Sequence, residues 1–314
     1  MNQSSPGSYV NEKDRSQQVR AVSTSIGAIV GPATKGPIMK TVLVTNEEEF
    51  ISTFGKPDPR QSLMHYAALE FLSKSSRLMV TRVANDDATR PLPLTAGAMF
   101  TVDDMNARVP RPKLSVFDDG NKKSLGVYDP FNNFVFPPST QPAALNQLFM
   151  ICAVDPGEWN NQIYVEVRPN VKPMVTGTDE FYDDLNAFYV DVWMNYKSPR
   201  QPKDESFLVR RVPTLDGYGN QMYIEDVINN KSKIIRVRNN DAAPEIKLTE
   251  TCAVFFGGGT SGGRVSMGQM LRGWDLYRDP DHINVNILIQ GGVPPGMNSL
   301  QDIADVQRRM TEIA

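Results

Sequence analysis

"SSPGSYVNEKDRSQQVRAVSTSIGAIVGPATKGP", residues Ser4–Pro37, joins two stretches of opposite character. The first, Ser4–Arg20, is polar, and after its proline the only apolar side chains are Tyr9, Val10 and Val19. Such a segment cannot bury enough apolar surface to offset the entropy lost on ordering, so it either stays unattached or is ordered on something else. The second contains "TSIGAIVG" (Thr24–Gly31), which predicts a buried strand that ends at a Gly-Pro turn.

Strands and helices are predicted to alternate after this strand. "KTVLV" (Lys40–Val44) predicts a second short strand. Thr45 or Asn46 then caps a helix, and Glu48 or Glu49 is the partner in its capping box. The next predicted elements are a helix end at Gly55, an amphipathic helix over Met64–Leu72 and a strand over Arg77–Ala84. This order is typical of an α+β or α/β unit.

The stretch from about Arg90 to Gln147 differs from its surroundings because it is rich in proline and has poor periodicity. It predicts a loop-rich β insertion that lies on the surface rather than in the core. Several strands follow, and the last of them ends in the glycine loop "GGGTSGG". The final segment predicts a helix over Val265–Tyr277, a strand over Ile283–Gln290 and a helix from Ser299. Because that helix has no stop signal, we expect the 314 residues to belong to a longer chain.

Composition argues against several classes of function. The formal charge of −3 and the pI near 5.6 argue against nucleic-acid binding as the main role. No apolar run approaches the roughly 20 residues that span a bilayer, and the chain does not start with a signal peptide. Cys152 and Cys252 are far apart and predict buried or free thiols in a reducing compartment, which favours folding in a cytoplasm.

The glycine cluster Gly257–Gly263 is the strongest candidate for chemistry. Gly257, Gly259 and Gly262 match the spacing of a dinucleotide-binding loop, but no Lys-Ser or Lys-Thr pair follows as in a phosphate-binding P-loop. A plain turn and a nucleotide-binding α/β enzyme therefore both stay open, and the turn is favoured.

The remaining reactive side chains do not form a recognisable site. His65 and His282 have no second ligand at metal-binding spacing, and the paired carboxylates lie in loop-like sequence. No segment combines a nucleophile, a base and a group that orients the base. We therefore expect no enzyme, no catalytic residues, no cofactor and no metal site.

The opening stretch, followed by "VTNEEEFISTFGKP", resembles the start of contractile-tail sheath proteins of large contractile-tailed bacteriophages. In that family a Ser-Pro-Gly start and an extended arm precede a strand, a Gly-Pro turn and a capped helix. The matching residues are Ser5-Pro6-Gly7, Gly31, Gly36-Pro37, Val44-Thr45-Asn46 and Phe54-Gly55. Three later stretches resemble the family in the same order, namely Ala153–Val167, Phe255–Gly292 and Met297–Ala314. The family continues beyond this point through the rest of an inner domain to a C-terminal arm.

The resemblance implies an α+β, multidomain fold with an inserted β-rich outer domain and an extended N-terminal arm. The implied parts are a linker arm over residues 1–22, a discontinuous middle α+β domain over 23–89 and 149–263, an outer surface domain over 90–148, and the start of the inner domain over 264–314. The arm would link neighbouring subunits through its Ser-Pro-Gly start and its apolar side chains. These residues are Ser5, Pro6, Gly7, Tyr9, Val10 and Val19.

The resemblance also implies a function. The chain would be a structural subunit that forms stacked hexameric rings around a tail tube and contracts to drive the tube through the host envelope for genome delivery. Its partners would be other sheath subunits, the tail tube protein, and the baseplate and tail terminator proteins, with no direct contact to nucleic acid and no membrane insertion. It would be assembled in the host cytoplasm and reside in the virion tail. The sheath of a related contractile injection or secretion machine is the alternative within the same class.

Overall fold

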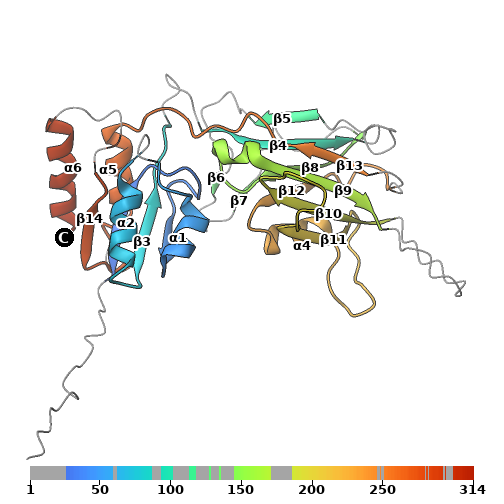
Figure 1. Cartoon of the computed structure of the whole chain (residues 1–314), viewed down its shortest axis with the longest axis horizontal. Helices are drawn as coiled ribbons and strands as arrows, with labels where there is room; N and C mark the ends of the chain where they lie inside the picture. Colours follow the sequence, from blue (N-terminus) through green and yellow to red (C-terminus); the bar gives the residue numbers. More distant parts are fainter. Residues whose placement is uncertain are drawn as a thin grey trace, which may run out of the picture.

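The computed structural model describes residues 26–58, 62–86, 93–101, 113–117, 127–128, 134–135, 145–170, 186–245, 248, 251–279, 281, 283–292, 294 and 300–314. These residues form two lobes that lie side by side along the long axis of the molecule (Figure 1). We call them the α/β lobe, which contains the described residues of 26–86 and 264–314, and the sandwich, which contains those of 93–256.

The α/β lobe is built on one four-stranded sheet. Its strands are β1 (Gly27–Gly31), β2 (Thr41–Val44), β3 (Leu78–Arg82) and β14 (Ile287–Gln290), and its helices are α1 (Glu47–Phe54), α2 (Met64–Leu72), α5 (Met267–Asp275) and α6 (Leu300–Ile313). The strand order is β14-β1-β3-β2. β1 pairs in parallel with both β14 and β3, whereas β2 pairs antiparallel with β3. β14 and β2 are therefore the two edge strands.

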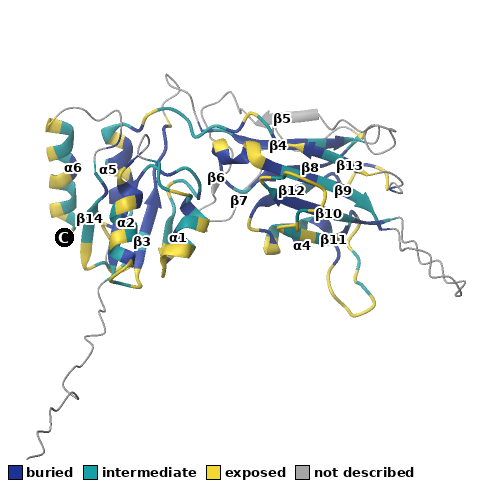
Figure 2. Cartoon of the chain, viewed as in Figure 1, coloured by how far each residue is buried: buried dark blue, intermediate teal, exposed yellow. Residues whose placement is uncertain are grey.

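Apolar side chains leave both faces of this sheet, and helices cover each face. Ile29 and Val80 pack with α1 and α2 on one face. Ala28 and Val30 pack with α5 and α6 on the other face. All five residues of β1 are buried, as the unbroken apolar run "GAIVG" predicts for a central parallel strand (Figure 2).

The predicted ends of helix α1 are confirmed. The side chain of Asn46 accepts a hydrogen bond from the backbone N–H of Glu49 at 2.8 Å. The Glu49 carboxylate in turn accepts from the backbone N–H of Thr45, also at 2.8 Å. Gly55 ends the helix with a φ of 86°, a left-handed conformation that glycine adopts without strain.

The predicted strand over Ile283–Gln290 is only partly confirmed, because β14 contains its last four residues alone. Ile283 and Val285 pack into the cluster beneath α5 and α6 instead of pairing with β1. The Asn286 side chain accepts a hydrogen bond from the backbone N–H of Ile26 at 3.1 Å. In Ile283–Asn286, the alternation of apolar residues therefore reflects burial of one face and not pairing in a sheet.

The sandwich consists of two four-stranded antiparallel sheets and one helix. Its elements are β4 (Thr95–Thr101), β5 (Lys113–Phe117), β8 (Gln147–Ala153), the 3-10 turn η2 (Glu158–Gln162), β9 (Ile163–Pro169), β10 (Ala187–Met194), β11 (Glu205–Arg210), α4 (Ile224–Lys231), β12 (Ile235–Asn239) and β13 (Cys252–Phe255). The sheet orders are β11-β10-β9-β13 and β12-β8-β4-β5. Side chains of both sheets and of α4 share one apolar core. A separate two-stranded ribbon pairs β6 (Val127–Tyr128) with β7 (Phe134–Val135).

Strand β4 differs from the prediction for residues 90–148. Ala96, Ala98 and Phe100 are fully buried, and β4 lies between β8 and β5 in its sheet. These residues belong to the core and not to the surface. Small side chains give β4 little apolar contrast, so its sequence "TAGAMFT" did not stand out from the loops around it.

The mixture of helices and sheets that the sequence predicts is confirmed, while the domain boundaries stay a prediction. β14, from the segment expected to begin an inner domain, pairs with β1, from the segment expected to belong to a middle domain. Most of residues 90–148 lie outside the described residues. The names α/β lobe and sandwich therefore refer to the observed sheets and not to the predicted domains.

Candidate assembly surface

The β14 edge of the α/β sheet is a place where another strand can pair. The backbone N–H of Ile287 donates to the carbonyl oxygen of Ile26, so Ile287 and Ile289 direct their backbone groups toward β1. Successive residues of a strand point these groups to opposite sides, and those of Leu288 and Gln290 therefore point away from β1. Among the described strands, none pairs with β14 on that side.

The side chains of β14 leave this edge partly exposed. Ile287 is 41% exposed, and the other three residues of the strand are only half-buried. Leu288 packs toward α5 and α6, while Ile289 packs toward α1 and α2. The edge thus combines unused main-chain positions with apolar side chains on both faces, which is what strand addition requires.

A buried arginine joins the two lobes. Arg82, at the end of β3, is 1% exposed. Its Nη1 donates to the carbonyl oxygen of Gly36 in the α/β lobe at 2.6 Å and to that of Pro156 in the sandwich at 2.9 Å. Beside it, the ammonium group of Lys35 lies 4.7 Å from the ring centroid of Trp159. Burial lowers the pKa of Lys35, as expected for an ammonium group inside this joint.

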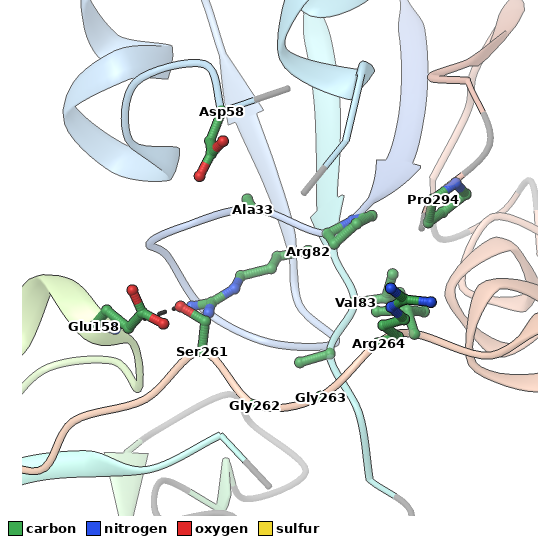
Figure 3. A pocket seen from close by; sticks show the side chains of 13 residues that line it. Ala33, Asp58, Arg82, Val83, Glu158, Ser261, Gly262, Gly263, Arg264 and Pro294 are labelled. Atoms are coloured by element: carbon green, nitrogen blue, oxygen red, sulfur yellow. Dashed lines mark hydrogen bonds between the residues drawn. The ribbon is translucent and has the colours of Figure 1, made fainter. Parts of the chain in front are cut away.

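A cavity of about 340 Å³ opens at the joint (Figure 3). Two acidic side chains, Asp58 and Glu158, and two basic ones, Arg82 and Arg264, contribute to its lining. Both signs of charge are thus present, and the lining does not select a strongly charged ligand. The hydroxyl of Ser261 accepts a hydrogen bond from the backbone N–H of Glu158 at 3.4 Å, which links the glycine loop to η2.

Three amides of the glycine loop Gly257–Gly263 donate hydrogen bonds within the protein. Gly259 N–H donates to the side chain of Asn161 at 2.8 Å, and Thr260 N–H donates to the carbonyl oxygen of Leu94 at 3.1 Å. Gly262 N–H donates to the Thr260 hydroxyl at 3.1 Å. A dinucleotide-binding loop needs free amides at the start of a helix, yet helix α5 begins only at Met267. This geometry supports the turn and not the nucleotide site.

Comparisons with known proteins show what this chain is similar to. No family model matches the sequence. The tail sheath protein of Enterobacteria phage T4 is 30% identical over 99 residues. The crystal structure of a sheath tail protein from Listeria innocua superposes on 92% of this chain with a TM-score of 0.51, at 11% sequence identity. In part of its sequence and in its fold, the chain is therefore similar to tail sheath proteins.

The chain matches only part of each relative. It spans 44% of the Listeria protein, and the aligned region of the T4 protein is 15% of that protein. A second sheath tail protein, from Desulfitobacterium hafniense, aligns over 98% of this chain and 50% of its own length, with 12% identity and a TM-score of 0.48. All three of these relatives are named as sheath proteins.

The predicted N-terminal arm lies outside the described residues. Ser5, Pro6, Gly7, Tyr9, Val10 and Val19 all precede residue 26, where the description begins. Their role in linking subunits stays a prediction. The described residues include a sheet edge that can accept a strand, which is the kind of partner such an arm would need.

Sequence reasoning missed one exposed feature of the chain. Tyr218, in the loop between β11 and α4, is 94% exposed, and Leu215 in the same loop is 65% exposed. The sequence "LDGYGN" (Leu215–Asn220) is typical of a turn, which explains why the loop attracted no notice. The aromatic residue between two glycines is the sequence feature that could have indicated an exposed tip.

The histidine and cysteine predictions can be tested in part. His65 is fully buried, its Nε2 lies 3.2 Å from the carbonyl oxygen of Phe54, and its ring packs edge-on against Phe50, so this histidine has a packing role. His282 lies outside the described residues. Cys152 and Cys252 are buried free thiols, as predicted.

In the described part of the chain, no cluster of three or more His, Cys, Asp or Glu side chains could hold a metal ion. Within the same residues, no helix has the length and apolar character needed to cross a membrane.

Proposed function

We propose that this protein is a subunit of a contractile tail sheath. In this proposal, copies of the chain stack as hexameric rings around a tail tube, and the assembled sheath contracts to drive the tube through a host envelope. The observation that carries the proposal is the fold: 92% of the chain superposes on a sheath tail protein although only 11% of residues are identical. The short sequence match to the T4 tail sheath protein supports the same assignment.

The link between subunits is the N-terminal arm, which adds a strand to the sheet of a neighbour. The seventeen residues Ser4–Arg20 reach at most about 55 Å when extended, against a diameter of about 50 Å for a compact domain of this length. Each main-chain hydrogen bond formed by the arm contributes on the order of 0.5–1.5 kcal/mol. The β14 edge, with outward backbone groups at Leu288 and Gln290, is the acceptor that we assign to this arm.

A strand-added arm suits a contractile assembly because it holds neighbours together while their bodies rotate. The tail tube templates an extended sheath of higher energy, which the baseplate nucleates and the terminator protein ends. Release at the baseplate lets contacts between subunits re-form with more burial, and this free energy moves the tube. Genome delivery from the virion tail follows, and the sheath itself is assembled in the host cytoplasm.

Electron microscopy of the full-length protein tests the proposal. We expect tubes of stacked rings or rod-like polymers. Deletion of residues 1–20 leaves the described core intact and is expected to give folded monomers that do not polymerise. Soluble monomers from the unmodified protein at high concentration would contradict the proposed function, and normal tubes from the deletion would remove the arm from the mechanism.

A further inference from the structure

The hairpin over residues 211–222, which follows β11, carries exposed apolar side chains. Tyr218 at its tip is 94% exposed, Leu215 is 65% exposed and Val212 is 42% exposed. The hairpin projects from the sandwich, away from the joint with the α/β lobe, and most of it is exposed (Figures 1 and 2). Apolar side chains gathered on a projecting loop indicate a contact surface more than isolated exposed residues do.

The tip is held in one conformation by Asp216. Its carboxylate accepts hydrogen bonds from the backbone N–H groups of Tyr218 and Asn220 and from the Asn220 side chain, each at 2.8 Å. Gly219 N–H donates to the Asp216 carbonyl oxygen at 3.0 Å, and Gly219 adopts a left-handed φ of 84°. These hydrogen bonds, led by those from Asn220, hold the pKa of Asp216 below its usual value, so the carboxylate is ionised at neutral pH.

The base of the hairpin is anchored in the sandwich. Arg211 is 6% exposed, and its guanidinium donates to the side chain of Asn239 at 3.1 Å and to the carbonyl oxygens of Asn240 and Pro244 at 2.8 and 2.7 Å. Met222 N–H donates to the Thr214 carbonyl oxygen across the hairpin at 2.9 Å. The loop therefore presents its tip at a fixed position, and little ordering entropy is lost when a partner binds.

The composition of the tip fits a protein partner. Tyr218 is flanked by Gly217 and Gly219 and followed by Asn220. Tyrosine, glycine and asparagine are the residues that antibody loops use to bind protein surfaces, and tyrosine is enriched among residues that dominate binding energy. A tip that meets a different face of its partner makes a heterologous contact. Repeated contacts of this kind build closed rings or open helical arrays.

We infer that the tip Leu215–Asn220 docks on a second copy of this chain, with Tyr218 as the side chain that buries most area in the contact. This inference rests on the proposed function, which places copies of the chain side by side in an open array. It adds a contact between rigid bodies to the flexible link made by the arm. Such a contact fixes the relative orientation of two subunits, which an extended arm does not do.

Site-specific photo-crosslinking tests the inference on polymers of the full-length protein. A benzophenone amino acid replaces Tyr218, or in a matched control it replaces Tyr66, which is 49% exposed on α2. We expect irradiation to give a covalent dimer of this chain from position 218 in much higher yield than from position 66. Equal yields from polymers, or capture of a different protein in the assembled tail, would overturn the inference and leave the proposed function standing.

Alanine variants give a second readout. Tyr218→Ala removes an almost fully exposed ring, so the monomer is expected to fold normally, while the critical concentration for polymerisation rises by about tenfold. Tyr66→Ala is expected to leave the critical concentration unchanged. An unaltered critical concentration for Tyr218→Ala would overturn the inference. If the unmodified protein forms no polymer under any condition, the proposed function fails first and the inference fails with it.

Discussion

Nη1 of Arg82 lies 2.9 Å from the carbonyl oxygen of Pro156 and donates a hydrogen bond to it. Arg82 ends a strand of the α/β lobe, whereas Pro156 belongs to the sandwich, so this bond crosses the joint. The arginine is 1% exposed, and the same nitrogen also donates to Gly36. Because this buried, charged side chain donates to carbonyl groups of both lobes, the stability of each lobe depends on how the two lobes are positioned.

Replacement of Arg82 by methionine is expected to destabilise the protein by about 2–5 kcal/mol, because two buried carbonyl oxygens lose their donor. Urea unfolding followed by circular dichroism measures the change. Arg264→Met, at an exposed arginine of the same cavity, is the control and is expected to cost less than about 1 kcal/mol. Equal costs for the two variants would show that the Arg82 hydrogen bonds do not hold the joint.

Replacement of Gly259 by alanine tests the packing of the glycine loop. A Cβ at this position would lie 2.6 Å from the carbonyl oxygen of Gly157 and 2.8 Å from Cβ of Asn160. We expect a loss of about 1–3 kcal/mol in unfolding free energy. Gly217→Ala is the matched control, because nothing lies within 4 Å of its Cβ, and it is expected to change stability by less than about 0.5 kcal/mol. A neutral Gly259→Ala would contradict the close approach.

Stability is expected to fall below about pH 6.5 through His65. Burial lowers the pKa of His65 in the folded protein below its usual 6.5, although the contact with Phe54 opposes this. The unfolded state therefore binds the proton more tightly, and the stabilisation present above pH 6.5 is lost as the pH falls toward the folded pKa.

Comparison with His65→Gln isolates this effect, because glutamine retains a donor for the Phe54 carbonyl oxygen and does not titrate. Urea midpoints at about pH 7.5 and about pH 5.5 are expected to differ more for the unmodified protein than for the variant. The same difference in both proteins would assign the pH dependence to other groups.

Replacement of Gln290 by proline tests the β14 edge as the acceptor of the arm. The backbone N–H of Gln290 points away from β1, so proline removes an outward donor and leaves the pairing with β1 in place. We expect folded monomers with a strongly reduced yield of polymer in electron micrographs. Gln307→Ala, which removes only the side-chain hydrogen bond to Gln290, is expected to polymerise normally. Normal polymers from the proline variant would place the arm elsewhere.

Local signals explain what could be predicted. The cap at Asn46, the stop at Gly55 and the apolar run of β1 each depend on residues that are neighbours in sequence, so their geometry follows from nearby chemistry. The same holds for α5, where Ser266 and Gln269 form a capping box. Elements with weak local contrast were harder to place, and the small side chains of β4 hid a buried strand.

The candidate site was predictable only as a possibility. An arm poor in apolar residues indicates that it either stays unattached or is ordered on something else, and the sequence does not show which surface could order it. The β14 edge exists because Ile26 and Asn286, which are 260 positions apart, meet at the start of a parallel pair. The exposure of Tyr218 likewise depends on the direction that buried Arg211 gives to its hairpin.

The sequence by itself determined where helix α1 begins and ends, which strand is wholly buried and that the first residues are poor in apolar side chains. These properties depend on hydrogen bonds and apolar patterns within a few residues. The tertiary structure alone decided which strands are neighbours, which edge is open and how Arg82 joins the lobes. Such contacts connect residues far apart in the chain, and their free energy appears only when the intervening segments have folded.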